Sequence, residues 1–125
     1  MRVLLIVDDD EDTCASLTEL LDVEGFACLT ATSGSEGLRL LEFKRPILVI
    51  LDFRLKDMDA TEFLRRKASM PSVATIPVVV VTAARNAPMP RGAVAQLDKP
   101  FGIDDLLAEI KKHVEPAVEP GPEAP

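Results

Sequence analysis

One short stretch constrains the fold of this chain more than any other. Residues 47–51 form an unbroken aliphatic run, Ile-Leu-Val-Ile-Leu, and a single carboxylate, Asp52, follows it directly. A run of this length and composition is typical of a strand that is buried on both faces of a parallel sheet. Open α/β sheets bind ligands at the carboxyl ends of such strands, so the sequence predicts that Asp52 faces a binding crevice.

Three further segments end in the same way, with polar side chains directly after an apolar run. These are residues 3–7 before Asp8, Asp9 and Asp10, residues 76–81 before Thr82, and residues 93–97 before Asp98, Lys99 and Pro100. If the strands are parallel, their carboxyl ends meet at one edge of the sheet. The sequence therefore predicts one pocket that contains several carboxylates, a hydroxyl and an ammonium group.

Segments with a helical pattern lie between these strands. They cover residues 11–24, 33–44, 59–69 and 103–114, and the first carries apolar residues at Cys14, Leu17, Leu20 and Leu21. Alternating strands and helices predict right-handed crossovers and a doubly wound parallel α/β sheet. Residues 26–31 and 93–97 are the least aliphatic strands and belong at the edges, which gives five strands in the order 2-1-3-4-5.

Length and composition limit the other possibilities. A chain of 125 residues with 47% hydrophobic content predicts one domain, residues 1–114, and a disordered tail, residues 115–125, that is rich in Pro and Glu. No apolar run approaches the ~20 residues of a membrane helix, so we expect a cytoplasmic protein without membrane insertion. The net charge of -7 argues against direct nucleic-acid binding. The two cysteines lack the spacing of a metal site, and no disulfide is expected.

The predicted pocket has a definite chemistry. Asp8, Asp9 and Asp52 cannot all stay ionised at close range unless a cation offsets their repulsion, and oxygen ligands open to water suit Mg²⁺. Asp52 could then attack phosphorus, while Thr82 and Lys99 each take one phosphoryl oxygen. Any one of these residues could simply cap a helix or mark a turn. Their occurrence at corresponding strand ends favours a common site.

Four stretches of the chain resemble the receiver domain of two-component response regulators, a family with a flavodoxin-like fold. They are Val-Leu-Leu-Ile-Val-Asp-Asp-Asp at 3–10, Leu-Asp-Phe-Arg-Leu-Lys-Asp-Met-Asp at 51–59, Ile-Pro-Val-Val-Val-Val-Thr-Ala at 76–83 and Lys-Pro-Phe at 99–101. The resemblance covers residues 2 to about 114. It implies phosphorylation at Asp52 and direct Mg²⁺ binding by Asp9, Asp52 and the backbone carbonyl of Arg54, with Asp8 acting mainly through water.

The same resemblance assigns the remaining polar residues. It implies that Thr82 is the switch hydroxyl, that Lys99 senses the phosphate, and that the peptide bond before Pro100 is cis. It also implies a sensor histidine kinase or phosphotransfer protein as phosphoryl donor and a downstream protein as target. The chain would then be a phosphoacceptor in signalling rather than an enzyme.

The sequence departs from the family pattern in several places. Lys56 stands where the family usually has proline, Ala60 where it usually has glycine, and Gln96 where it commonly has an aromatic residue. Residues 83–92 include two prolines, which exclude a regular helix through this stretch. The fourth helix of the family is therefore expected to be shortened or missing.

Two functions are compatible with these features. The first is a stand-alone receiver that is phosphorylated on Asp52, and the alternative is a degenerate receiver that binds partners without phosphorylation. A haloacid-dehalogenase-like phosphatase would need a second aspartate at the position of Arg54, and a flavodoxin would need a phosphate loop and an aromatic residue to stack the flavin ring. The single histidine, His113, is expected to be a solvated residue near a helix end.

Overall fold

Five strands form one parallel sheet in the order β2-β1-β3-β4-β5. The computed structural model describes residues 2–114, and its strands are β1 (Val3–Val7), β2 (Ala27–Ala31), β3 (Leu48–Asp52), β4 (Val78–Thr82) and β5 (Ala95–Asp98). The aliphatic strands β1, β3 and β4 are central and almost wholly buried, whereas β2 and β5 form the two edges. The predicted strand order is thereby confirmed.

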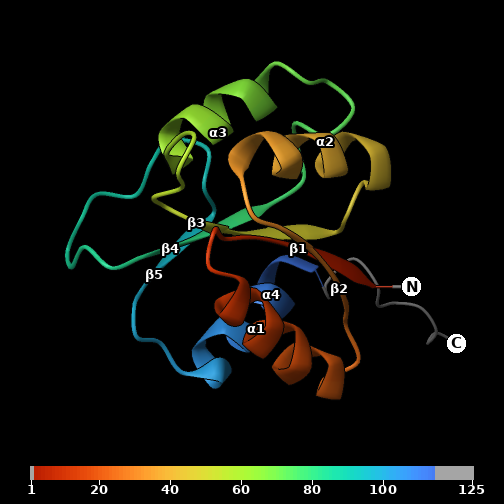
Figure 1. Ribbon diagram of the computed structural model, residues 1–125, viewed down its shortest axis with the longest axis vertical. Helices are drawn as coiled ribbons and strands as arrows, with labels where there is room; N and C mark the ends of the chain where they lie inside the picture. Colours follow the sequence, from red (N-terminus) through yellow and green to blue (C-terminus); the bar gives the residue numbers. More distant parts are fainter. Residues whose placement is uncertain (1, 115–125) are drawn as a thin grey trace, which may run out of the picture.

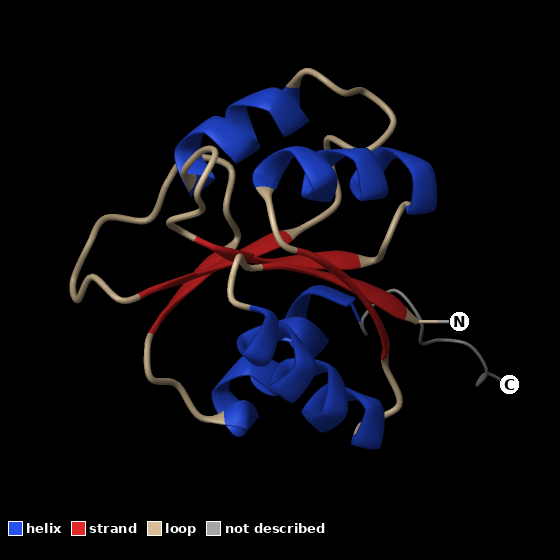
Figure 2. Cartoon of the chain, in the orientation of Figure 1, coloured by secondary structure: helices blue, strands red, loops and turns tan. Residues whose placement is uncertain are grey.

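Two pairs of helices cover the two faces of the sheet. Helices α1 (Glu11–Val23) and α4 (Ile103–Val114) lie on one face, and α2 (Gly34–Lys44) and α3 (Ala60–Ala68) lie on the other (Figure 1, Figure 2). Successive residues of a strand point to opposite faces. Leu4 and Ile6 of β1 therefore join the core with α1 and α4, while Leu5 and Val7 join the core with α2 and α3.

Side-chain caps fix where the helices begin. Ser33 Oγ accepts a hydrogen bond from the backbone N–H of Glu36 at 3.1 Å, and the Glu36 carboxylate accepts one from the N–H of Thr32 at 3.0 Å. This arrangement is close to a capping box. Asp10 and Asp59 cap α1 and α3, accepting from the backbone N–H groups of Asp12 and Glu62, respectively.

A loop joins β4 to β5 where a further helix was expected to be reduced or lost. Residues 83–94 contain no helix, which confirms the prediction from the two prolines. The loop is tied to the sheet at two points, because the Gln96 side-chain amide donates to the Ala87 carbonyl at 2.7 Å and the Val94 N–H donates to the Val78 carbonyl at 2.9 Å. Gly92 lies beside Leu64 of α3, so the loop also contacts the adjacent helix.

The prediction for His113 was wrong, and Leu20 differs from the other apolar residues of its helix. Leu20 is 47% exposed, because α1 buries only the narrower stripe formed by Cys14, Leu17 and Leu21. His113 is half-buried rather than solvated, and its Nε2 lies 3.6 Å from Glu109 Oε1 on the same helix.

The predicted tail at 115–125 lies outside the described residues. Within residues 2–114, no helix has both the length and the apolar character that crossing a bilayer requires.

Candidate functional site

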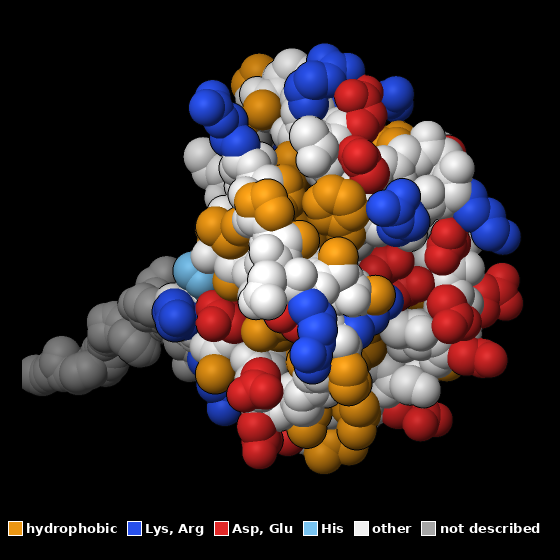
Figure 3. Space-filling model, turned by 90° about the vertical axis from the view of Figure 1, so that its left-hand side faces the viewer, with side chains coloured by type: hydrophobic (Ala, Val, Ile, Leu, Met, Phe, Trp, Pro, Cys, Tyr) orange, Lys and Arg blue, Asp and Glu red, His pale blue; other side chains and the backbone are white. Residues whose placement is uncertain are grey.

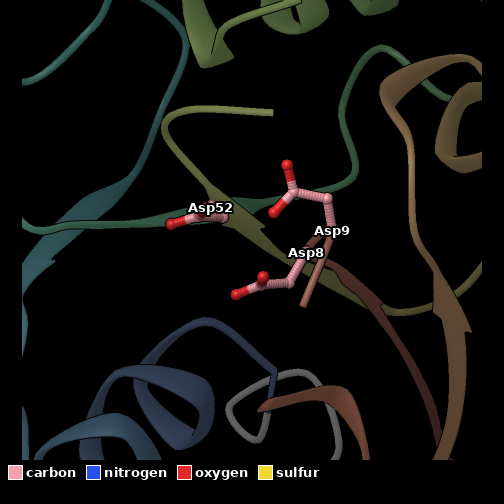
Figure 4. A group of neighbouring side chains, drawn as sticks. All are labelled: Asp8, Asp9 and Asp52. Carbon is pink, nitrogen blue, oxygen red and sulfur yellow. The ribbon is translucent and has the colours of Figure 1, made fainter. Parts of the chain in front are cut away.

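Three carboxylates meet at the carboxyl edge of the sheet. Asp8 and Asp9 follow β1, and Asp52 ends the neighbouring strand β3 (Figure 4). One oxygen from each residue lies within 4.8 Å of the others. Helix α1 leaves β1 toward one face of the sheet and α3 follows β3 on the other, so these ends border the crevice that open α/β sheets use for ligands (Figure 1). The structure thus brings together the three acidic residues that the sequence places in one pocket.

Asp8 is the most buried member of this acidic cluster. Its residue is 3% exposed, and its Oδ1 accepts a hydrogen bond from the backbone N–H of Asp10 at 2.9 Å. Burial raises the pKa of Asp8, and repulsion from Asp52 and Asp9 adds to the rise, whereas the Asp10 N–H and Lys99 oppose it. Negative charge is therefore costly at this position unless a cation is close.

Lys99 supplies positive charge from the loop after β5. Its Nζ lies 2.9 Å from Asp52 Oδ1 and 3.6 Å from Asp8 Oδ2, and its backbone N–H donates to the Thr82 carbonyl at 2.7 Å. Partial burial opposes the charged form, but the two carboxylates outweigh it and raise the pKa of Lys99. The peptide bond between Lys99 and Pro100 is cis, as expected.

Thr82 and Arg54 border the same site. Thr82 ends β4 and is 4% exposed, and its Oγ1 accepts a hydrogen bond from the Ala84 N–H at 3.1 Å. A pocket of about 200 Å³ joins the two residues to Asp52 and Lys99. The backbone of Arg54 pairs with that of Asp59 across the loop after β3, and its residue is exposed.

The donor set fits a hard divalent cation. All three clustered side chains offer carboxylate oxygens, the ligands that Mg²⁺ and Ca²⁺ prefer, and none offers sulfur or imidazole. Lys99 contacts only part of this cluster, so its single charge leaves the net charge of the four side chains negative. The acidic cluster can therefore hold a metal ion.

A larger groove adjoins the acidic cluster. It has a volume of about 610 Å³ and runs between α1 and the loop that leads into α4. Apolar side chains from both elements line it, including Leu17, Leu20 and Phe101. Figure 3 looks at this edge of the molecule and shows hydrophobic side chains above and below the acidic region.

The groove and the contacts of one acidic side chain are not evident from the sequence. Leu20 shares the helical spacing of the apolar residues in α1, but the buried stripe is already complete with Cys14, Leu17 and Leu21, so the spacing alone does not show that Leu20 lines a groove. Asp57 was assigned no role, yet its carboxylate binds the start of α2. No pattern along the chain links Asp57 to residues more than twenty positions away.

Comparisons with known proteins agree with this geometry. The model of the response regulator receiver domain matches residues 4–111. The chain is 32% identical over 116 residues to sporulation initiation phosphotransferase F of Bacillus subtilis, covering 89% of this chain and 92% of that protein. It is 34% identical over 113 residues to the transcriptional regulatory protein PrrA of Mycobacterium tuberculosis, covering 86% of this chain but only 48% of that relative. The chain thus spans about half the length of that relative.

Solved structures show the same fold. A CheY-like receiver domain from Methanospirillum hungatei superimposes with a TM-score of 0.81 at 30% identity, covering 93% of this chain and 95% of the other. The response regulator TrrA from Thermotoga maritima, solved in complex with Mg²⁺ and BeF, gives a TM-score of 0.82 at 26% identity, covering 91% and 100% of the two chains.

Proposed function

The chain belongs to the response regulator receiver domain family, whose members are phosphoacceptor signalling modules rather than classical enzymes, and we propose that it accepts a phosphoryl group on Asp52. The donor is a sensor histidine kinase or a phosphotransfer protein, and phosphorylation changes the binding of a downstream protein target. One observation carries the proposal: Asp52 lies among two further carboxylates with Lys99 Nζ at 2.9 Å. A cytoplasmic location and a stand-alone arrangement stay predictions.

The residues of the site fit the transfer step. A carboxylate oxygen of Asp52 attacks phosphorus, and the bond from phosphorus to the donor's leaving nitrogen breaks, with its electron pair staying on that nitrogen. The product on this chain is an acyl phosphate. Lys99 Nζ lies close enough to Asp52 to bind a phosphoryl oxygen, and the Thr82 hydroxyl, which lines the same pocket, would donate to another. These two groups would thus stabilise the negative charge that develops on the phosphoryl group.

Mg²⁺ is the proposed cofactor. Asp8, Asp9 and Asp52 would hold it, and the family resemblance adds the backbone carbonyl of Arg54. When bound, the ion would neutralise carboxylate charge and bind a phosphoryl oxygen. Asp8 supports this assignment, because burial and two acidic neighbours raise its pKa and make a nearby cation favourable.

The groove beside the acidic cluster is the proposed contact surface for the phosphoryl donor. A donor histidine can reach Asp52 only if the donor protein covers the rim of the site. On one side that rim is the groove between α1 and the loop after β5, where Leu20 offers an exposed apolar side chain. Binding surfaces commonly centre on such apolar side chains with a polar surround.

An alternative function is favoured by one part of the structure. The β4–β5 connection has no helix, and Gln96 ties this loop to the sheet through the Ala87 carbonyl. A surface of this kind could bind a partner whether or not Asp52 is phosphorylated. The chain would then be a degenerate receiver that serves as an interaction module.

Phosphate incorporation distinguishes the two functions. The wild type and Asp52→Asn are incubated with acetyl phosphate and Mg²⁺, and intact mass is measured. The proposed function predicts one phosphoryl adduct on the wild type and none on Asp52→Asn. Asp104→Asn, an exposed aspartate in the first turn of α4, is the control and should be labelled like the wild type. An unlabelled wild type would favour the interaction module, and a labelled Asp52→Asn would show that another residue is the acceptor.

A further inference from the structure

The loop between β3 and α3 carries part of the proposed site and is closed on itself. Residues 53–59 follow directly after Asp52. The Leu55 N–H donates to the Met58 carbonyl at 3.1 Å, and the Ala60 N–H donates to the Phe53 carbonyl at 2.8 Å. The loop is therefore a compact turn. A contact that fixes residues near Met58 also restrains residues near Leu55, because hydrogen bonds join the two.

Asp57 joins this turn to α2. Its Oδ1 accepts a hydrogen bond from the backbone N–H of Gly34 at 2.8 Å, and its Oδ2 accepts from the N–H and Oγ of Ser35, each at 3.0 Å. The Gly34 N–H contributes most to lowering the pKa of Asp57, and Ser35 adds to it although slight desolvation opposes it. The side chain is thus a carboxylate at neutral pH, bound at the positive end of a helix.

The two elements are also in direct apolar contact at this point. Gly34 is buried, and a Cβ atom added there would lie only 2.5 Å from Met58 Cγ. The close approach is possible only because Gly34 has no side chain. It places Met58 beside the hydrogen bonds of Asp57. Lys56, between Asp57 and Arg54, does not have the fixed φ angle of proline, so the shape of the turn depends on such contacts.

We propose that Asp57 is a positioning residue for the acidic site. By fixing the turn to α2, it holds the Arg54 backbone and the end of β3 in place before a metal ion binds. This inference rests on the proposed function, because it concerns Mg²⁺ at the cluster of Asp8, Asp9 and Asp52. Asp57 itself lies outside this cluster, and its side-chain hydrogen bonds go to α2.

The expected consequence follows from conformational entropy. A turn that is already ordered loses little freedom when the ion binds, whereas a released turn must be ordered at that moment. Loss of the Asp57 contacts should therefore weaken Mg²⁺ binding by about fivefold. A change of this size in the dissociation constant corresponds to the net free energy of one hydrogen bond. Once Mg²⁺ is saturating, the rate of phosphorylation by acetyl phosphate should return close to that of the wild type.

The test compares two ways of weakening the start of α2. Asp57→Ala removes the hydrogen bonds between the turn and the helix. Ser33→Ala removes the N-cap of the same helix and keeps the hydrogen bonds of Asp57. Mg²⁺ affinity is measured by calorimetry, since the chain has no Trp or Tyr to report binding by fluorescence. Hydrogen exchange at residues 53–58 without metal gives a second readout that does not depend on activity.

The proposal expects weaker Mg²⁺ binding and faster exchange in Asp57→Ala, with both near wild type in Ser33→Ala. Ser35→Ala removes one of the three hydrogen bonds from the helix side and should give an intermediate result, which keeps the test valid if Asp57→Ala does not fold. Equal Mg²⁺ affinity and exchange in the wild type, Asp57→Ala and Ser35→Ala would overturn the positioning role while leaving the proposed function intact. A wild type that neither binds Mg²⁺ nor is phosphorylated would instead overturn the proposed function, and this inference with it.

Discussion

Asp8 shows how a single side chain makes the metal-free site unfavourable. Its carboxylate is buried beside two other acidic residues, and Lys99 and the backbone N–H of Asp10 stabilise its negative charge. A buried group of this kind stabilises the fold only when an opposite charge is close. The acidic cluster therefore lowers the stability of the protein without a metal ion and favours the binding of a cation.

Replacing Asp8 with asparagine should stabilise the protein without Mg²⁺ and weaken its stabilisation by Mg²⁺. Without Mg²⁺, Asp8→Asn should be more stable than the wild type by about 1 kcal/mol, because it removes the repulsion and keeps an oxygen that can accept from the Asp10 N–H. With millimolar Mg²⁺, the wild type should gain stability and the variant should gain much less. Melting temperatures of both proteins with and without Mg²⁺ test this, and equal Mg²⁺ responses would contradict it.

Lys99 stabilises the protein without a metal ion, because its ammonium group offsets the charges of Asp8 and Asp52. Lys99→Met removes the ammonium group that lies 2.9 Å from Asp52, so the metal-free protein should lose about 1–2 kcal/mol of unfolding free energy. This value is below that for a fully buried pair, because the Lys99 side chain is 32% exposed. Mg²⁺ should restore most of the loss.

The control is Lys112→Met, which breaks a pair between the exposed Lys112 and the half-buried Glu109 on α4. It should change the unfolding free energy by less than about 0.5 kcal/mol, with or without Mg²⁺. A loss in Lys99→Met that Mg²⁺ does not reduce would show that the lysine acts through packing rather than through charge.

At the scale of elements, the packing of α2 on the sheet leaves room for no further atoms. Gly37 is buried in α2, and a Cβ added there would lie 2.8 Å from Val7 Cγ2 and 3.2 Å from Phe63 Cε2. The close approach matters for the site, since β1 continues from Val7 into Asp8 and Asp9 and α2 anchors Asp57.

Gly37→Ala should destabilise the fold despite the better helix propensity of alanine. Overpacking a close-packed core costs about 1–3 kcal/mol, which exceeds the 0.5–1 kcal/mol or so that alanine gains in a helix. A net loss of about 1 kcal/mol is therefore expected in denaturant unfolding. Arg39→Ala, an exposed position of the same helix, should stay within about 0.5 kcal/mol of the wild type. A more stable Gly37→Ala protein would show that the interface can adjust.

The sequence predicts elements better than it predicts contacts between them. Aliphatic runs marked the central strands and their polar ends, and parallel topology then brought Asp8, Asp9 and Asp52 together without further information. The exposure of Leu20 could not be predicted, because helical spacing shows which face is apolar but not how wide the buried stripe is. The contacts of Asp57 could not be predicted, because they join the β3–α3 turn to the start of α2 only after the sheet has formed.

Charge is divided unevenly over the whole molecule. Residues 54–94 contain seven Lys or Arg and only three Asp or Glu, although the chain as a whole has a net charge of -7. The acidic excess therefore lies in the rest of the chain, including α1 and the strand ends at the site. The groove between α1 and the loop after β5 lies within this acidic part, so a phosphoryl donor that uses it should present basic groups around an apolar centre.

Leu20 is the residue that tests this mode of docking. It lines the groove and is 47% exposed, so Leu20→Ala should leave stability within about 0.5 kcal/mol of the wild type. If the donor protein packs on the groove, the truncation should slow phosphotransfer by about fivefold or more, the effect expected at an energetically important contact. Acetyl phosphate is too small to need the groove, so its rate of phosphorylation should not change.

Val23→Ala is the matched control, because Val23 lies on the same helix, is 82% exposed and is not part of the groove. Both variants are phosphorylated by a histidine-phosphorylated phosphotransfer domain that is active on the wild type, and separately by acetyl phosphate. Docking on the groove predicts that only Leu20→Ala is slowed, and only with the protein donor. Equal loss with both donors would mean that Leu20 affects the acidic site itself, and no loss with either would place the donor on another part of the rim.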